Sequence, residues 1–238
     1  MSIPPFYDAT QTLLTPEKYL GEERPKLPGT FFLFFYDSQT MKDLNRTQKP
    51  VKVKNIPGVH FESGGAGYKK MMMGSDMSVY MLELLMACGV NNFIVFGTAC
   101  SLVEEIKPNQ LCLLTSAVCE EGVSMHYAPY AREVTAHNIN AEIVRAAYKT
   151  GIPLHAVKAC TIAAIFRETA GKIESLRREG VSVLEMEASA LISAANSKKA
   201  SISFLFAVSD RIIGTEWQKW GDLQFNSETE LINNLMQA

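Results

Sequence analysis

The chain has 238 residues, of which 47% are hydrophobic and 20% are charged, and its formal net charge is -2. This composition is typical of a folded protein with a large core. The small net charge, without a basic stripe, gives no electrostatic reason to expect nucleic acid or a membrane surface as a partner. No apolar run approaches the roughly 20 residues that span a bilayer. No repeat or linker divides the sequence, so we expect one domain at 29–238 after an N-terminal extension at 1–28.

The N-terminus and the cysteines indicate the compartment. The first residues lack a basic segment followed by an apolar one, so a secretory signal is not expected. The cysteines lie mostly in apolar runs and form no CxxC pair; they are Cys88, Cys100, Cys112, Cys119 and Cys160. Reduced core thiols in a cytoplasmic protein are therefore predicted, and no metal site is expected because no His and Cys fall at zinc-ligand spacing.

Apolar runs alternate with amphipathic segments along the chain. Hydrophobic periodicity predicts strands at 31–37, 51–56, 69–74, 91–99, 110–119, 155–164, 182–186 and 201–210. It predicts helices at 78–89, 140–151, 168–180, 187–199 and 225–238. Continuous apolar strands between helices predict an α/β fold in which a mostly parallel sheet is covered by helices on both faces. Ligands of such sheets bind beyond the carboxyl ends of the strands.

Residues 183–191 read VLEMEASAL and place Glu185 and Glu187 where a buried strand becomes a helix. An unpaired carboxylate among apolar residues is unfavourable, so these groups need partners. Glu187 has two acceptor oxygens and can accept hydrogen bonds from both hydroxyls of a cis-diol such as ribose. A glutamate stabilised by the helix dipole fits the same spacing equally well.

Two further strand ends carry candidate residues. Asp210 ends the uncharged run SISFLFAVS, and a carboxyl group in apolar surroundings suits general-acid catalysis. An aspartate that caps the next turn is the commoner alternative. Gly97 and Thr98 offer a hydroxyl and backbone N–H groups to an anion at a helix start. However, GTACSL lacks the later glycines of a Walker or dinucleotide-binding motif.

Four segments in chain order resemble the nucleoside phosphorylase family, which includes uridine phosphorylase, bacterial purine nucleoside phosphorylase and methylthioadenosine nucleosidase. VLEMEASAL is similar to the ribose-binding E-M-E segment, and FIVFGTACSL matches the R-x-G-[ST]-x-G segment in part. EGVSMHYAPY with VTAHNINAEIVRAA is similar to uridine phosphorylases, whereas AVSDRI matches the Ser-Asp of the purine enzymes. The resemblance covers about 78–212 and implies a partly barrel-like sheet and a homo-oligomer. It implies no cofactor, with inorganic phosphate as co-substrate.

The resemblance implies roles around the nucleoside. Glu187 would bind the 2′ and 3′ hydroxyls of ribose, Met186 would pack under the sugar, and Glu185 would assist there. Phe166 would stack on the base, or Ile165 if the alignment slips by one position.

The resemblance also implies the reacting groups. Asp210 would protonate a purine ring nitrogen as the glycosidic bond breaks. Thr98, with Gly97 and Gly74, would bind phosphate. Trp217 and Trp220 are candidates for a subunit interface.

The anion site departs from the family pattern. Asp37 remains from a glycine-aspartate-proline segment without its following arginine, Val95 replaces another arginine, and Cys100 replaces a glycine. Candidate replacement cations are Lys69 and Lys70, or, from a neighbouring subunit, Arg46, Lys52 and Lys54. We therefore expect a phosphorylase for purine nucleosides or uridine, with a phosphate-independent nucleosidase and a catalytically weak nucleoside-binding protein as alternatives. Asp210 favours a purine, and HYAP at 126–129 favours uridine.

Overall fold

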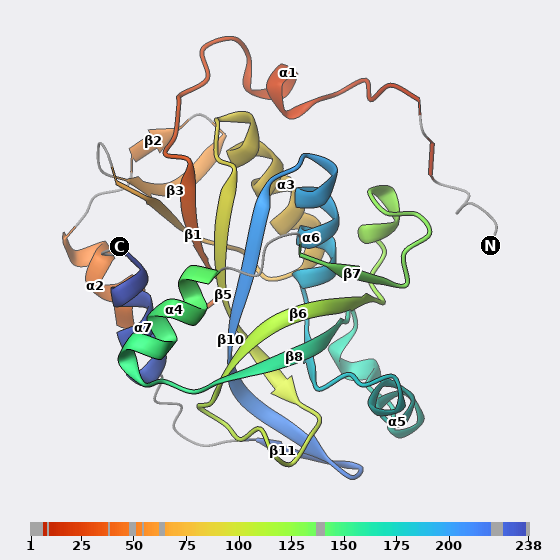
Figure 1. The fold of residues 1–238 in the computed structure, drawn as a ribbon. Helices are drawn as coiled ribbons and strands as arrows, with labels where there is room; N and C mark the ends of the chain where they lie inside the picture. Colours follow the sequence, from red (N-terminus) through yellow and green to blue (C-terminus); the bar gives the residue numbers. More distant parts are fainter. Residues whose placement is uncertain are drawn as a thin grey trace.

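The structure is a computed structural model that describes residues 7–8, 10–37, 39–47, 51–53, 55–61, 65–136, 141–219 and 226–236 (Figure 1). Its strands are β1 (Thr30–Phe34), β2 (Val51–Val53), β3 (Ile56–Phe61), β4 (Gly67–Lys70), β5 (Asn92–Ser101), β6 (Leu111–Cys119), β7 (Glu133–Thr135), β8 (Leu154–Thr161), β9 (Val183–Glu185), β10 (Ser201–Ile213) and β11 (Glu216–Lys219). Its helices are α1 (Pro16–Leu20), α2 (Gln39–Thr47), α3 (Ser75–Ala87), α4 (Ala141–Thr150), α5 (Ala170–Arg178), α6 (Ala188–Ser197) and α7 (Asn226–Met236), with 3₁₀ turns η1 (Ser124–His126) and η2 (Ile165–Arg167).

The central strands close into a ring. β10 pairs in parallel with β5 and antiparallel with β6, while β6 pairs in parallel with β8. β8 pairs in parallel with β9, and β9 returns antiparallel to β5. From β5 the sheet continues outward through β1, β4, β3 and β2. The predicted α/β class with a mixed, partly barrel-like sheet is therefore confirmed.

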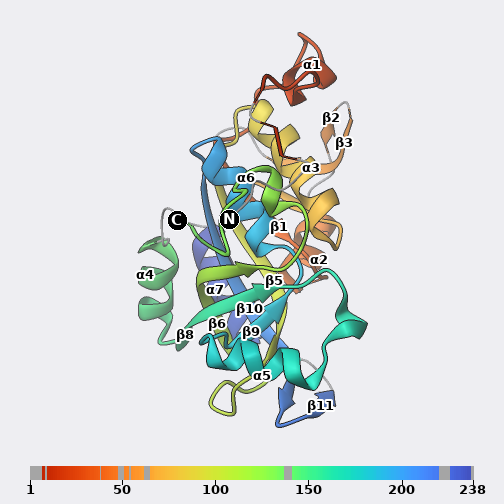
Figure 2. The same cartoon turned by 90° about the vertical axis from the view of Figure 1, so that its right-hand side faces the viewer.

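Helices cover both faces of this sheet. Ile143 of α4 and Leu231 of α7 pack with Phe34 and Phe96 on one face. On the other face, α3 and α6 contact each other and share a core with β1, β5 and β10. Figures 1 and 2 show α4 and α7 on one side of β5 and β10 and α3 on the other. In the described ranges, no helix has both the length and the hydrophobicity to cross a lipid bilayer.

The predicted strands at 69–74 and 91–99 end at other residues than expected, and both differences affect the site. β4 stops at Lys70, and Gly74 instead precedes α3 with a φ of 104°, which residues with a side chain rarely adopt. β5 continues through Gly97 and Thr98 to Ser101, because its pairing with β10 extends that far. Thr98 therefore lies inside a strand, and no helix begins there whose N–H groups could bind an anion.

Other differences are local. The predicted strand at 51–56 is a hairpin, since Asn55 with a φ of 63° turns β2 into β3. The extension at 1–28 contains the short helix α1, capped by Thr15. The boundary at residue 28 stays a prediction. The periodicity did not predict α2, β7 or β11.

Candidate functional site

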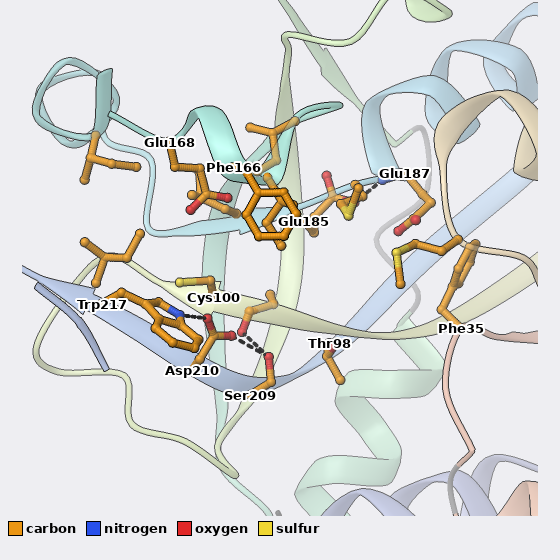
Figure 3. A pocket seen from close by; sticks show the side chains of 18 of the residues that line it. Phe35, Thr98, Cys100, Phe166, Glu168, Glu185, Glu187, Ser209, Asp210 and Trp217 are labelled. Carbon is orange, nitrogen blue, oxygen red and sulfur yellow. Dashed lines mark hydrogen bonds between the residues drawn. The ribbon is translucent and has the colours of Figure 1, made fainter. Parts of the chain in front are cut away.

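A cavity of about 520 Å³ lies at the carboxyl ends of β5, β9 and β10, beside η2 and the β10–β11 hairpin (Figure 3). It is lined by Phe35, Met73, Thr98, Ala99, Cys100, Ile162, Ile165, Phe166, Glu168, Ala170, Ile173, Leu184, Glu185, Met186, Glu187, Ser209, Asp210, Ile212, Gly214, Thr215 and Trp217. In Figure 3, Glu187 and Phe35 lie toward one end and Asp210, Trp217 and Glu168 toward the other, with Phe166 between them. A volume of several hundred Å³ suits a small organic ligand.

Glu185 holds the turn between β9 and α6. Its Oε2 accepts hydrogen bonds from the N–H groups of Glu187 at 2.7 Å and Ala188 at 2.6 Å, and its Oε1 accepts one from the Thr161 hydroxyl. Burial raises the pKa of this carboxyl group, which is 4% exposed. Both oxygens are thus used within the protein, so Glu185 orients the segment that carries Glu187 although it also lines the cavity.

Glu187 is the half-buried carboxyl group at the other side of the same turn. Its Oε1 accepts a hydrogen bond from the Gly74 N–H at 2.7 Å, so Gly74 supports Glu187 from the loop before α3. Burial, together with the nearby Glu185 carboxylate, raises the pKa of Glu187 to about 8. Among the described residues, no salt bridge pairs Glu187 with a cation. Such a desolvated carboxyl group is suited to accept two ligand hydroxyls.

The raised pKa of Glu187 predicts a pH-dependent effect on stability. Between the unfolded value of 4.5 and the folded value of about 8, the folded chain keeps a proton that the unfolded chain releases. Stability therefore falls as the pH rises through this window. Glu187→Gln removes the ionisable group. The melting temperature of the variant should therefore rise relative to that of the parent protein between about pH 5 and pH 9, by roughly 2–4 °C for each kcal/mol of unfolding free energy that the parent protein loses. Melting curves measured across this range test this; a constant difference between the two proteins would contradict it.

A β-bulge shapes the end of the cavity that contains Asp210. The register of β10 against β5 shifts between Val208 and Asp210, so Ser209 is an extra residue in β10. A bulge re-aims side chains, and here both Ser209 and Asp210 line the cavity instead of alternating across the strand. Asp210 Oδ1 accepts a hydrogen bond from the Ser209 hydroxyl at 2.7 Å, and Oδ2 accepts one from Trp217 Nε1 at 2.7 Å.

The turn η2 places an aromatic ring and a carboxyl group at the cavity. Phe166 is 97% exposed and Ile165 is 50% exposed, so both have a free apolar surface for a ligand. Glu168 follows them, and burial and the nearby Asp210 charge raise its pKa. Sequence reasoning missed Glu168, whose signal was its position at the start of the predicted helix at 168–180, four residues after the strand-like run at 155–164.

The predicted phosphate-binding residues are only partly brought together. Thr98 lines the cavity, but Gly97 and Gly74 do not. Gly97 packs against Phe206, since a Cβ atom at this position would lie 3.2 Å from that ring. The glycine thus serves the close approach of β5 and β10.

The cavity offers few groups for an anion. No Arg, Lys or His is among the described residues that line it. Lys69 donates to the Pro57 carbonyl, burial lowers its pKa, and Lys70 forms a 2.6 Å salt bridge with Asp37.

The remaining candidates lie elsewhere. Arg46 pairs with Asp43 at 3.3 Å, and the Lys52 side chain is exposed, both outside the cavity. Lys54 and Trp220 fall outside the described residues. No residue of the 122–130 loop lines the cavity; Ser124 in this loop bonds to the buried Glu121 instead.

Comparisons with known proteins agree with the motifs. The family model of the phosphorylase superfamily matches residues 51–232. A DeoD-type purine nucleoside phosphorylase of Exiguobacterium sp. is 29% identical over 149 residues, which cover 59% of this chain and 60% of that relative. The DeoD-type enzyme of Brevibacillus brevis is 28% identical over 151 residues, which cover 59% and 61%. The chain thus matches about three fifths of the length of these relatives. Because the family model matches most of the sequence, the chain belongs to the phosphorylase superfamily, the nucleoside phosphorylase family that its motifs resemble.

Proposed function

We propose that this protein cleaves the N-glycosidic bond of a purine ribonucleoside. The observation that carries the proposal is a single cavity with Glu187 at one end, Asp210 at the other and the exposed ring of Phe166 between them. Glu187 binds the ribose hydroxyls, Met186 packs under the sugar, and Phe166 stacks on the base. Ile165 extends this apolar surface.

The chemistry of the bond requires opposite charges at the two ends. As the bond breaks, positive charge develops on the sugar ring and negative charge on the base. Asp210 counters the negative charge on the base, because it gives a proton to the base and thereby neutralises the leaving group. Glu187 holds the sugar in a fixed orientation, which lowers the entropic part of the barrier.

Two observations favour a purine over uridine. Asp210, the residue that matches the purine enzymes, lines the cavity, whereas HYAP at 126–129 lies outside it. In addition, the relatives reported above are named purine nucleoside phosphorylases.

Phosphate is the first candidate for the nucleophile, since the relatives are phosphorylases, and the products would be free base and ribose 1-phosphate. Thr98 would then donate to the phosphate. Water is the second candidate, favoured by the lack of a cation among the described lining residues, because an anion there would face several carboxyl groups without a positive charge to offset them. We further propose that the enzyme is a homo-oligomer without a resident cofactor and that it is located in the cytoplasm. The five free cysteines support the cytoplasmic location.

An assay with and without phosphate separates the candidates. The purified protein is incubated with adenosine, inosine and uridine, and free base is measured by chromatography. Release of purine that depends on phosphate is expected for the phosphorylase, and release at equal rate without phosphate for the hydrolase. Saturable binding with no release would overturn the catalytic proposal in favour of a nucleoside-binding protein.

A further inference from the structure

Asp210 is held from two sides by groups of different hydrogen-bonding character. Ser209 Oγ lies 2.7 Å from Oδ1, and a hydroxyl can donate or accept. Trp217 Nε1 lies 2.7 Å from Oδ2, and an indole N–H can only donate. The two carboxyl oxygens are therefore not equivalent.

We propose that Trp217 is a positioning residue that keeps Oδ2 as an acceptor, so that the acidic proton of Asp210 is carried on Oδ1. This inference deepens the proposed function and rests on it, because it assigns the oxygen that serves the base. In a neutral carboxyl group, the carbonyl oxygen accepts a hydrogen bond from an indole N–H better than the hydroxyl oxygen does. When Asp210 carries the proton that the proposed function requires, that proton is therefore on Oδ1, and the Ser209 hydroxyl, which donates to Oδ1 of the carboxylate, accepts from it.

The assignment gives a balanced proton transfer. When the glycosidic bond breaks, its electron pair passes to the base. The Oδ1–H bond of Asp210 breaks, and a new N–H bond forms at a ring nitrogen of the base. The carboxylate that remains is stabilised by two donors, since the Ser209 hydroxyl reverses its direction and Trp217 keeps its bond. The nucleophile meanwhile bonds to the sugar carbon and releases its proton to solvent, and Asp210 takes up a proton from solvent before the next turnover.

The β10–β11 hairpin explains how Trp217 reaches Asp210. Trp217 is paired with Ile212, and Asp210 lies two residues before Ile212 on the same face of β10. This diagonal is within reach of a large aromatic side chain. Gly214, with a φ of 60°, allows the two-residue turn that sets this register. Trp217 is 62% exposed, which leaves surface for a subunit interface. An interface role does not require the hydrogen bond to Asp210, so this bond needs an explanation of its own.

A spectroscopic experiment tests the bond without any substrate. The chain has two tryptophans, so a ¹H–¹⁵N correlation spectrum has two indole N–H signals, and Trp217→Phe assigns one of them. Asp210→Ala should move the Trp217 signal upfield and speed its exchange with water, whereas Asp210→Asn, which retains an acceptor oxygen, should leave it closer to the parent position. An unchanged signal in Asp210→Ala would overturn the proposal.

Kinetics test the positioning role. Trp217→Phe should lower kcat about tenfold, the effect expected for one lost hydrogen bond to an ionised group, with a smaller change in KM. Trp217→Gln retains a neutral N–H donor and should recover part of the loss. Glu216→Ala is the matched control, because this exposed neighbour points to the opposite face of β11.

The outcomes separate this inference from the proposed function. Equal kcat values for the parent protein and Trp217→Phe would overturn the positioning role even if the indole bond is observed. If no nucleoside is cleaved by the parent protein, the proposed function fails, and the indole spectra still decide whether Trp217 holds Asp210.

Discussion

Glu187→Ala is expected to weaken nucleoside binding about 100-fold, because two ribose hydroxyls lose the carboxylate that accepts their hydrogen bonds.

The parent protein should also bind the nucleoside more tightly as the pH rises toward 8. The pKa of Glu187 in the empty cavity is about 8, and hydroxyl donors favour the ionised carboxylate, so binding releases a proton. Isothermal titration calorimetry in two buffers of different ionisation enthalpy measures both the affinity and this proton.

Matched variants make the result specific for the sugar. Glu174→Gln changes an exposed carboxyl group on α5 and should leave the affinity unaltered. A 2′,3′-dideoxynucleoside should bind the parent protein and Glu187→Ala with similar affinity, because it lacks both hydroxyls. If Glu187→Ala retains full affinity for the ribonucleoside, the ribose assignment is wrong, and with it the nucleoside cavity as proposed.

Asp210→Asn is expected to lower kcat for purine nucleosides by roughly 10²–10³-fold, within the range of general-acid catalysis, while binding is retained. The amide has nearly the shape of the carboxyl group and keeps an oxygen for Trp217 Nε1, but it has no acidic proton for the base. Steady-state kinetics at saturating nucleoside measure kcat, and a binding titration shows that the cavity is intact.

A leaving-group series tests whether the lost group is the acid. A nucleoside whose base leaves without protonation should be cleaved by Asp210→Asn at a rate close to that of the parent protein. Asp43→Asn, an exposed carboxyl change on α2, is the matched control. Unchanged turnover in Asp210→Asn would remove Asp210 from the mechanism, and a larger loss in Glu168→Gln would transfer the acid role to Glu168, the other carboxyl group at this end.

The sequence determined the α/β class and the position of most strands. Long apolar runs such as 201–210 are predictable because burial on both faces requires apolar residues throughout the strand. The segment VLEMEASAL also indicated the turn that carries Glu187, since two glutamates among buried residues need partners.

Only the tertiary structure decided how the site is completed. Of the Glu185 oxygens, which the resemblance places near the sugar, Oε2 is used by the N–H groups of the turn and Oε1 by the Thr161 hydroxyl. Gly74 and Gly97 serve backbone geometry and close strand packing rather than lining the cavity. These roles depend on pairings between residues that are distant in sequence, and hydrophobic periodicity contains no information on such pairings.

The same holds for the acid end of the cavity. The sequence determined that a carboxyl group follows an apolar run at Asp210. The bulge at Ser209 and the contacts with Trp217 and Glu168 were decided by the register of β10 against β5 and β11 and by the course of η2. A shift of one residue in that register would turn Asp210 to the other face of the sheet, so the chemistry of the cavity is set by strand pairing, which local sequence patterns do not specify.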